Sequence, residues 1–314
     1  MKNDVQFNQL EFQDLKKYAT SSIDWIDRNL ERFSPIRTGD FNNSDLKSFA
    51  ELTLVYALLE EWNDLHIDNH LSKWRNFILK HCEEQSYAQM VRKSPRSAFL
   101  YLLPYLMLRS TGYRSTYYED TLDYIQRWGY FESIELVPYR SLDLQYMCWK
   151  SGYFNHEPDW YKLYRSTVLG RFRSPLSLDN DAAYSVTHTL FYLTDFGNRN
   201  TPIAASEIDH VTKLIEYLLI HYWRVGHWDL MGELLINLNC LGRNDSFIYA
   251  KASQAFQEAW RNDGGIPGMR LERDLDREDD EEETFQNCYH TTLVGVLYCA
   301  TSMNSMRKEK RGDI

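Results

Sequence analysis

The chain has 314 residues, 43% of them hydrophobic and 25% charged, which are ordinary values for a globular protein. Its formal net charge of −10 is concentrated in Glu272–Glu283, a run with a net charge of −7 that leaves −3 for the rest of the chain. The sequence has no basic stripe of the kind that follows a phosphate backbone, which excludes nucleic acid and an anionic membrane surface as partners.

Leader, membrane and disulfide signals are missing from the sequence. The N-terminal residues contain no apolar core of signal-peptide length, and the most apolar stretch, Ser97–Leu108, is too short to span a bilayer. The five cysteines are spread widely and do not have the spacing of a disulfide framework. We therefore expect a reduced, cytoplasmic protein that does not insert into membranes. The sequence makes no prediction of its oligomeric state.

Taken in chain order, apolar segments of helical length recur throughout the sequence. They start 40 to 59 residues apart, at Glu51, Ser97, Ser141, Asp181, Trp228 and Asn287. Four of them are followed by a glycine at the place where a residue in the left-handed conformation ends a helix, namely Gly112, Gly152, Gly197 and Gly242.

Six amphipathic segments alternate with the apolar ones. They lie near residues 8–31, 69–83, 115–128, 159–169, 205–223 and 245–261. Each amphipathic segment precedes an apolar one, so the pattern predicts twelve helices in six hairpins and an all-α fold.

Six hairpins can be arranged in two ways. An open α-solenoid stacks each hairpin on its neighbours and leaves long surfaces for partners. A closed (α/α)6 toroid places the apolar helices inside and the amphipathic ones outside, and it is favoured because the apolar segments are apolar nearly all round. We expect a single all-α domain over residues 1–314, with an acidic loop or lid at about 263–283 and a disordered tail at about 304–314.

When the apolar segments are aligned on their terminal glycines, polar residues coincide at two positions that are one helical turn apart. The first set lies nine residues before the glycine, or at the aligned place in the last segment, and consists of Asp143, His188, Glu233 and His290. The second set lies one turn earlier on the same helix face and consists of Tyr139, Tyr184, Asp229 and Gln286. In a toroid the first set forms a belt around the axis.

The belt combines residue types that carry out proton chemistry. We expect His188 and His290 to act as general acid/base or ligand residues, and Tyr184 to donate a hydrogen bond to a substrate oxygen. Their expected carboxylate partners are Glu233, Asp229 and Asp143. The alternative for each residue is a satisfied polar group in the core of a packed helix.

Aromatic residues beside these positions are candidates for substrate binding. His227 and Trp228 belong to an aromatic-rich turn between helices, where indole and phenol rings commonly stack on sugars or planar groups. Tyr139 and Tyr289 lie on the predicted inner helices. The alternative is that these side chains only pack the turn and the helices.

Asp229, Cys288 and His290 are residue types that bind zinc. The set resembles the zinc ligands of prenyltransferase β-subunits, which have a terpenoid-cyclase-like toroid, and of lanthionine cyclases, because those α/α toroids take zinc ligands from such positions. The chain departs from both families, since it lacks the Cys-His-Gly of the lanthionine cyclases and the Gly-rich hairpins of the prenyltransferases. We therefore expect no cofactor, with zinc on these three residues as the alternative.

Three segments carry a second resemblance: "AAYSVTHTLFYLTDFG", "HWDLMGELLINLNCLG" and "FQNCYHTTLVGVLYC". They resemble a group of uncharacterised bacterial helical-hairpin proteins encoded among natural-product and peptide-modification genes. The resemblance covers about residues 181–299 and implies an α/α fold and a biosynthetic role, without assigning a reaction.

Together with the belt, this resemblance predicts an enzyme that performs acid/base chemistry on a small or peptidic substrate in a central toroid cavity. Cyclisation, isomerisation or epimerisation, elimination and glycoside cleavage are the candidate reactions. The alternative is a helical-repeat module that binds a peptide or protein without catalysis.

Overall fold

The computed structural model describes residues 2–37, 41–62, 65, 67–93, 98–171, 174, 178–270 and 280–311. This part of the chain forms fifteen α-helices and one 3-10 helix, and it contains no β-strand beyond an isolated bridge between His227 and Met269. The prediction of an all-α fold is therefore confirmed. None of the helices in these ranges is both long enough and apolar enough to cross a membrane.

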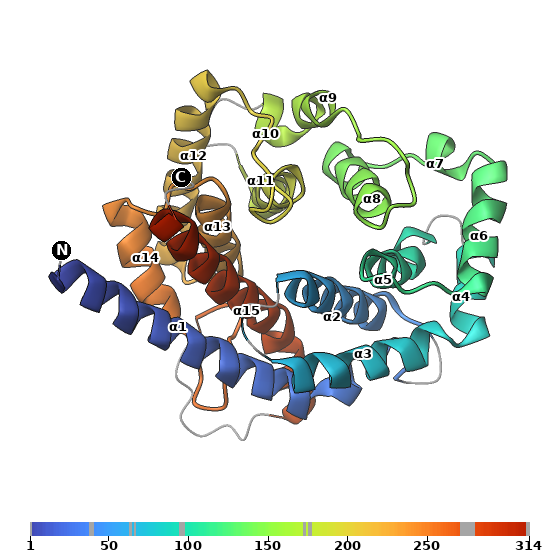
Figure 1. Ribbon diagram of the computed structural model, residues 1–314, viewed down its shortest axis with the longest axis horizontal. Helices are drawn as coiled ribbons and strands as arrows, with labels where there is room; N and C mark the ends of the chain where they lie inside the picture. Colours follow the sequence, from blue (N-terminus) through green and yellow to red (C-terminus); the bar gives the residue numbers. More distant parts are fainter. Residues whose placement is uncertain are drawn as a thin grey trace. The chain divides into compact units, whose positions relative to one another are not determined.

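The contacts divide the chain into two compact units, which are described separately. Unit 2 comprises Asn29–Asp159, and unit 1 comprises Met1–Arg28 together with Trp160–Ile314. The helices of unit 2 are η1 (Leu30–Phe33), α2 (Asn43–Trp62), α3 (Asp68–Cys82), α4 (Gln85–Lys93), α5 (Ala98–Ser110), α6 (Thr116–Arg127), α7 (Tyr130–Ser133) and α8 (Pro138–Lys150). In this unit α5 packs between α2 and α8, and α4 links α5 to α6 (Figure 1).

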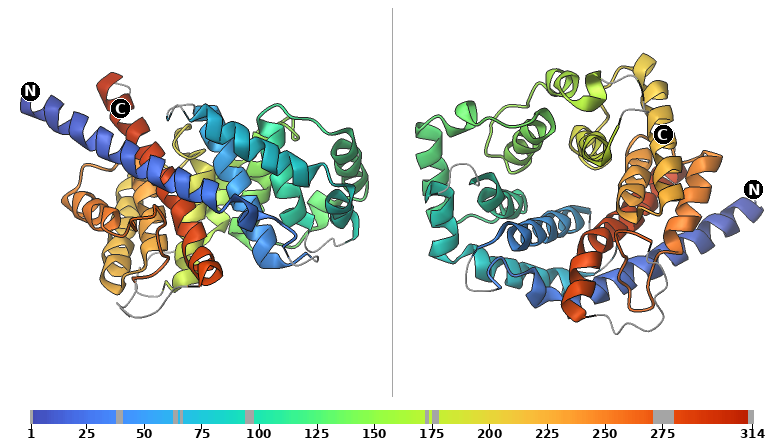
Figure 2. Two further views of the ribbon diagram at one scale, coloured as in Figure 1. Left: turned by 90° about the horizontal axis from the view of Figure 1, so that it is seen from below. Right: turned by 180° about the vertical axis from the view of Figure 1, so that it is seen from behind.

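Unit 1 is built around one central helix. Its helices are α1 (Lys2–Arg28), α9 (Trp160–Ser166), α10 (Val168–Arg171), α11 (Asn180–Leu193), α12 (Ala205–Val225), α13 (Trp228–Cys240), α14 (Phe247–Gln257) and α15 (Glu281–Arg311). Helix α13 packs against α11, α12, α14 and α15, so it is covered on all sides. Helix α1, in blue, crosses α15, in red, in both views of Figure 2, and these two helices are in contact.

The twelve predicted helices all have observed counterparts, whereas the short helices η1, α4, α7 and α10 were not predicted. The six apolar segments are α2, α5, α8, α11, α13 and α15, and the six amphipathic segments are α1, α3, α6, α9, α12 and α14. The four terminal glycines all have positive φ angles, between 63° and 91°, as the left-handed conformation requires. Closure into a toroid and the single domain stay predictions.

One pairing differs from the predicted order. The sequence pattern pairs α1 with α2, but α1 belongs to unit 1 and packs along α15, whereas α2 belongs to unit 2. The first and last helices of the chain are thus partners. Trp25 of α1 stacks on Phe285 of α15 with ring centroids 6.0 Å apart, which accounts for this pairing in part.

The C-terminal residues differ from the predicted disordered tail. Helix α15 continues through Arg311, so residues 304–311 are helical, and only 312–314 of the expected tail lie outside the described residues. Met303 and Ser305 are buried, and Lys308 Nζ donates a hydrogen bond of 2.6 Å to the Gly197 carbonyl at the end of α11. These contacts stabilise the last turns, whose polar sequence does not predict them.

The predicted acidic loop also begins differently. Residues 264–267 are buried against α1 and α15, since Ser22 Oγ donates to the Gly264 carbonyl and the Ile266 amide donates to Thr292 Oγ1, each at 2.9 Å. The start of the expected loop is therefore packed against these helices, and residues 281–283 form the first turn of α15. Residues 271–279 of the predicted loop or lid lie outside the described residues.

A glycine sets the separation of the helices that carry the candidate site. A Cβ atom on Gly232 of α13 would lie 2.6 Å from Phe256 of α14 and 2.7 Å from Val294 of α15. Both contacts are closer than real Cβ atoms make, so only glycine permits this close packing.

We predict that Gly232→Ala destabilises the protein by about 1–3 kcal/mol, because the added methyl group overpacks α13 against α14 and α15. Denaturant unfolding followed by circular dichroism measures this change. Ser206→Ala, at an exposed position of α12, is the control and should shift the free energy of unfolding by less than about 0.5 kcal/mol. Equal stability of Gly232→Ala and the wild type would contradict the close approach.

Candidate functional site

Helix α13 carries a polar stripe although it is buried. Every residue from Trp228 to Asn239 is buried, and half of them are leucine, isoleucine or methionine. Asp229, Glu233 and Asn237 are spaced by four residues and therefore share one face. His227 caps the start of the helix, since its Nδ1 accepts a hydrogen bond of 3.4 Å from the Leu230 amide. The stripe places two carboxylates and an amide inside unit 1.

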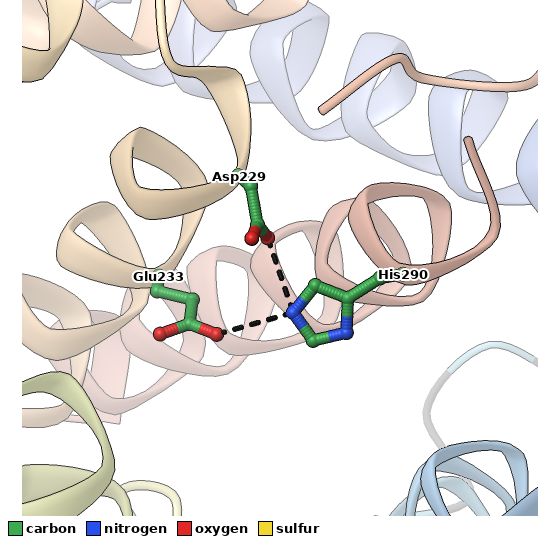
Figure 3. A group of neighbouring side chains, drawn as sticks. All are labelled: Asp229, Glu233 and His290. Carbon is green, nitrogen blue, oxygen red and sulfur yellow. Dashed lines mark ion pairs between the residues drawn. The ribbon is translucent and has the colours of Figure 1, made fainter. Parts of the chain in front are cut away.

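Two histidines from the flanking helices meet this stripe. His290 Nε2 of α15 lies 3.2 Å from Asp229 Oδ1 and 3.5 Å from Glu233 Oε1, as Figure 3 shows. His188 Nε2 of α11 lies 3.6 Å from the same Glu233 oxygen. One carboxylate oxygen is therefore shared by imidazoles from two different helices. We call Tyr184, His188, Asp229, Glu233 and His290 the His/carboxylate cluster.

Hydroxyl groups of α11 hold the other oxygen of each carboxylate. Tyr184 Oη donates to Asp229 Oδ2, and Thr187 Oγ1 donates to Glu233 Oε2, both at 2.5 Å. Short hydrogen bonds are typical of hydroxyl donors and ionised acceptors. Each carboxylate thus has one oxygen fixed by a hydroxyl group and one oxygen turned towards histidine.

The surroundings shift the protonation of the cluster. Burial raises the pKa of Glu233, but the neighbouring His188 and His290 lower it more, so that the pKa lies well below the usual range of a glutamic acid. Burial, followed by the charge of Asp229 and the hydrogen bond to it, raises the pKa of Tyr184 well above its usual value. Glu233 is therefore ionised and Tyr184 keeps its proton.

The exposure of the cluster is uneven. The side chains of Glu233 and Asp229 are 2% and 9% exposed, whereas those of His188 and His290 are 20% and 23% exposed. The carboxylates lie beneath and the imidazole rings reach solvent. A ligand can therefore meet the histidines without displacing the carboxylates.

The turn before α13 uses its aromatic residues in packing. The Trp228 ring is buried beneath the guanidinium group of Arg270, whose carbon lies 5.0 Å from the ring centroid. His227 lies between the rings of Tyr184 and Tyr222, at 6.3 Å and 5.4 Å between centroids. Burial lowers the pKa of His227, while Asp229 and Glu233 oppose that effect. The predicted substrate-binding role of these two residues stays a prediction.

The remaining predicted residues have other neighbours. Tyr139 and Asp143 belong to unit 2, where Arg140 lies over the Tyr139 ring and its Nη1 atom lies 3.1 Å from Asp143 Oδ2. Tyr289 is buried and stacks on Phe285, with centroids 5.3 Å apart. The predicted roles of Tyr139, Asp143 and Tyr289 stay predictions.

One group of side chains in the described residues has atoms spaced for a metal ion. Asp229, Glu233 and His290 each offer one ligand atom, and these three atoms lie within 4.8 Å of one another. The zinc set predicted from the sequence contains Asp229 and His290 but has Cys288 in place of Glu233. Cys288 is buried two residues before His290, which places it about 200° around α15 from that histidine.

Two residues of the site were not predicted. Thr187, which holds Glu233, precedes His188, and only its place next to that histidine signals a role. Asn237 is buried, and its side-chain amide nitrogen donates a hydrogen bond of 3.1 Å to the Thr187 carbonyl. This bond connects α13 to α11. The spacing of four between Asp229, Glu233 and Asn237 is the signal that identifies this residue.

A docked backbone segment also supports the site. The Asp229 amide donates to the Gly268 carbonyl at 3.2 Å, and the Gly268 amide donates to the Asn287 carbonyl at 2.9 Å. The segment therefore bridges the start of α13 to the start of α15. Nothing in the local sequence pairs these residues, so the contact was not predictable.

Comparison with known proteins assigns a family but no activity. The model of a protein family described as "Domain of unknown function (DUF6895)" matches residues 19–300, which include all five residues of the cluster. No curated protein and no solved structure matches the chain.

We predict that Glu233→Gln lowers the free energy of unfolding by about 3 kcal/mol near neutral pH, because it removes one partner of a buried charged group. The native pKa of Glu233 is lowered, so its stabilising contribution is present above the pKa of the unfolded chain and is lost as the pH falls below about 4.3. The difference between wild type and variant should therefore shrink in acid.

Denaturant unfolding at several pH values between about 3 and 7 measures this difference. Glu132→Gln, at an exposed position of α7, is the matched control and should differ little from the wild type at any pH. A difference that stays constant or grows as the pH falls would show that the carboxylate of Glu233 is not stabilised in its charged form.

Proposed function

The chain belongs to the DUF6895 family, and we propose that it is an enzyme which moves protons on a small or peptidic substrate through the His/carboxylate cluster. The observation that carries this proposal is the meeting of His188 Nε2 and His290 Nε2 at one buried oxygen of Glu233. A buried carboxylate stabilises the charged form of a neighbouring imidazole, and a histidine that gains and loses a proton is a general acid/base.

His188 is the residue we assign to proton transfer. Its Nε2 atom lies 3.6 Å from Glu233 Oε1, so that nitrogen faces a negative charge at a distance longer than a standard hydrogen bond. The neutral ring would take a proton from a substrate C–H bond next to a carbonyl group, leaving the electron pair on the substrate. The resulting imidazolium, stabilised by Glu233, would return the proton to the product.

His290 and Asp229 form the second half of the proposed site. Their side chains lie 3.2 Å apart, and His290 is partly exposed, so this pair can polarise the carbonyl oxygen of a substrate that reaches His188. Tyr184 has a single proton to donate, and it donates it to Asp229. We therefore assign Tyr184 to positioning Asp229, in place of the substrate contact expected from the sequence.

The arrangement favours some of the candidate reactions over others. Isomerisation, epimerisation and elimination require a base beside a polarising group, which the cluster offers. Glycoside cleavage requires two carboxyl groups about 5–5.5 Å apart, or farther, on either side of the scissile bond. Here Asp229 and Glu233 both pair with His290 Nε2, at 3.2 Å and 3.5 Å, so the two carboxylates face one imidazole and not the two sides of a scissile bond.

The substrate class is inferred from the family resemblance and from the charge of the chain. The resemblance to proteins encoded among peptide-modification and natural-product genes favours a peptide or a small metabolite of biosynthesis. The negative overall charge disfavours polyanions.

Solvent deuterium tests this proposal even though the substrate is not identified. The protein is incubated in deuterium oxide with pools of metabolites and short peptides, and mass spectrometry identifies compounds that gain deuterium at carbon. We expect incorporation by the wild type and a loss of about 10²–10⁴-fold in His188→Gln, since this is the usual contribution of one general base.

Two controls distinguish the loss of a catalytic group from misfolding or a non-specific effect of replacing a histidine. His210→Gln, on the exposed surface of α12, should retain wild-type incorporation, and circular dichroism should show that His188→Gln is folded. Incorporation that is unchanged in His188→Gln, or absent from the wild type in every pool, would overturn the proposal in favour of a binding module.

A further inference from the structure

Three atoms of the cluster are placed as metal ligands are placed. Asp229 Oδ1 and Glu233 Oε1 lie 3.2 Å and 3.5 Å from His290 Nε2. Ligand atoms that bind one zinc-like ion lie at about 2.0–2.2 Å from it and therefore within about 4.4 Å of one another. The two distances to His290 fall inside this range. We infer that Asp229, Glu233 and His290 together bind one divalent transition-metal ion.

The two carboxylates are oriented in the way that metal ligands require. Tyr184 fixes Asp229 Oδ2, and Thr187 fixes Glu233 Oε2, so the oxygens that face His290 are the ones left for a metal. Outer-shell hydrogen bonds of this kind commonly hold carboxylate ligands in place. Both hydroxyl donors lie on α11, and the helix that holds the ligands is therefore distinct from the helices that supply them.

Asp229 supplies an independent indication of a cation. Its side chain is 9% exposed, and its Oδ1 atom has His290 Nε2 as an ion-pair partner at 3.2 Å but accepts no hydrogen bond of good geometry within the described residues. A buried carboxylate oxygen without a hydrogen bond is costly. This oxygen points towards His290 Nε2 (Figure 3), and a cation bound between them would satisfy it.

The ligand types select among metals. Mg²⁺ and Ca²⁺ are bound by oxygen ligands, whereas imidazole suits zinc, iron and other transition ions. One imidazole with two carboxylates fits a divalent first-row ion such as Zn²⁺, Mn²⁺ or Fe²⁺. Cys288, on another face of α15, is not part of the proposed site, so a soft thiolate-bound ion is not expected.

This inference deepens the proposed function, on which its catalytic meaning rests. Three protein ligands leave coordination positions open, which is the arrangement of catalytic rather than structural sites. The ion would polarise a substrate carbonyl oxygen at the position assigned above to His290 and Asp229, while His188 remains the base.

Metal binding is tested on the full chain after removal of bound metal with a chelator. Equilibrium dialysis followed by metal analysis should show about one equivalent of Zn²⁺, and Co²⁺ should give a visible absorption spectrum. Asp229→Asn and His290→Ala should abolish both signals. Cys288→Ser should retain them, and Mg²⁺ should not compete.

The hydrogen bond from Tyr184 to Asp229 provides a variant that leaves all three ligands unchanged. Tyr184→Phe keeps the ring and removes only the hydroxyl group that holds Asp229, so it should weaken Zn²⁺ binding by about 10–100-fold. This variant keeps the inference falsifiable if a ligand variant does not fold. Less than about a tenth of an equivalent in the wild type, or binding that is unchanged in Tyr184→Phe and His290→Ala, would overturn the inference.

The outcomes separate this inference from the proposed function. Deuterium incorporation that depends on His188 in chelator-treated protein, without Zn²⁺ binding, would refute the metal site and leave proton transfer standing. Stoichiometric Zn²⁺ binding in a protein that incorporates no deuterium would support the metal site and refute the proposed reaction.

Discussion

The charge of Glu233 must be matched inside an otherwise apolar helix, and this requirement organises the rest of unit 1. Leucine, isoleucine and methionine surround the carboxylate along α13, and four other helices cover it. A carboxylate in such surroundings is stable only when it is hydrogen-bonded and paired. Thr187 supplies the hydrogen bond, and His188 and His290 supply the paired groups. Three helices are thereby fixed around one oxygen atom.

The close packing of these helices follows from small and polar residues of α13. Gly232 permits the approach of α14 and α15, and Asn237 binds the backbone of α11. At the far end of the helix, the Asn239 amide donates to Thr301 and Ser302 of α15, at 3.2 Å and 2.9 Å. These contacts hold the histidines close to the carboxylates. The same helix thus provides both the charge and the means of positioning its partners.

The sequence was sufficient for the twelve longer helical segments and for the alignment of much of the cluster, because both depend on local spacing. Terminal glycines set the register of the apolar segments, and that register aligned His188, Glu233 and His290, which the structure brings together. What the sequence did not predict depends on contacts between distant residues. The docking of residues 264–267 on α1 and the helical end of α15 are examples, since their local sequences are polar or rich in glycine. Thr187 and Asn237 were missed because their roles arise only once α11 and α13 are adjacent.

Nitrogen NMR of the histidine side chains in the metal-free protein tests most directly whether His188 and His290 share Glu233. If both imidazoles share Glu233, the Nε2 resonances of His188 and His290 should both move in Glu233→Gln, while those of the exposed His210 should stay in place. Wild-type positions for either resonance in that variant would show that the two histidines do not share this carboxylate, and would contradict the organisation of the site described above.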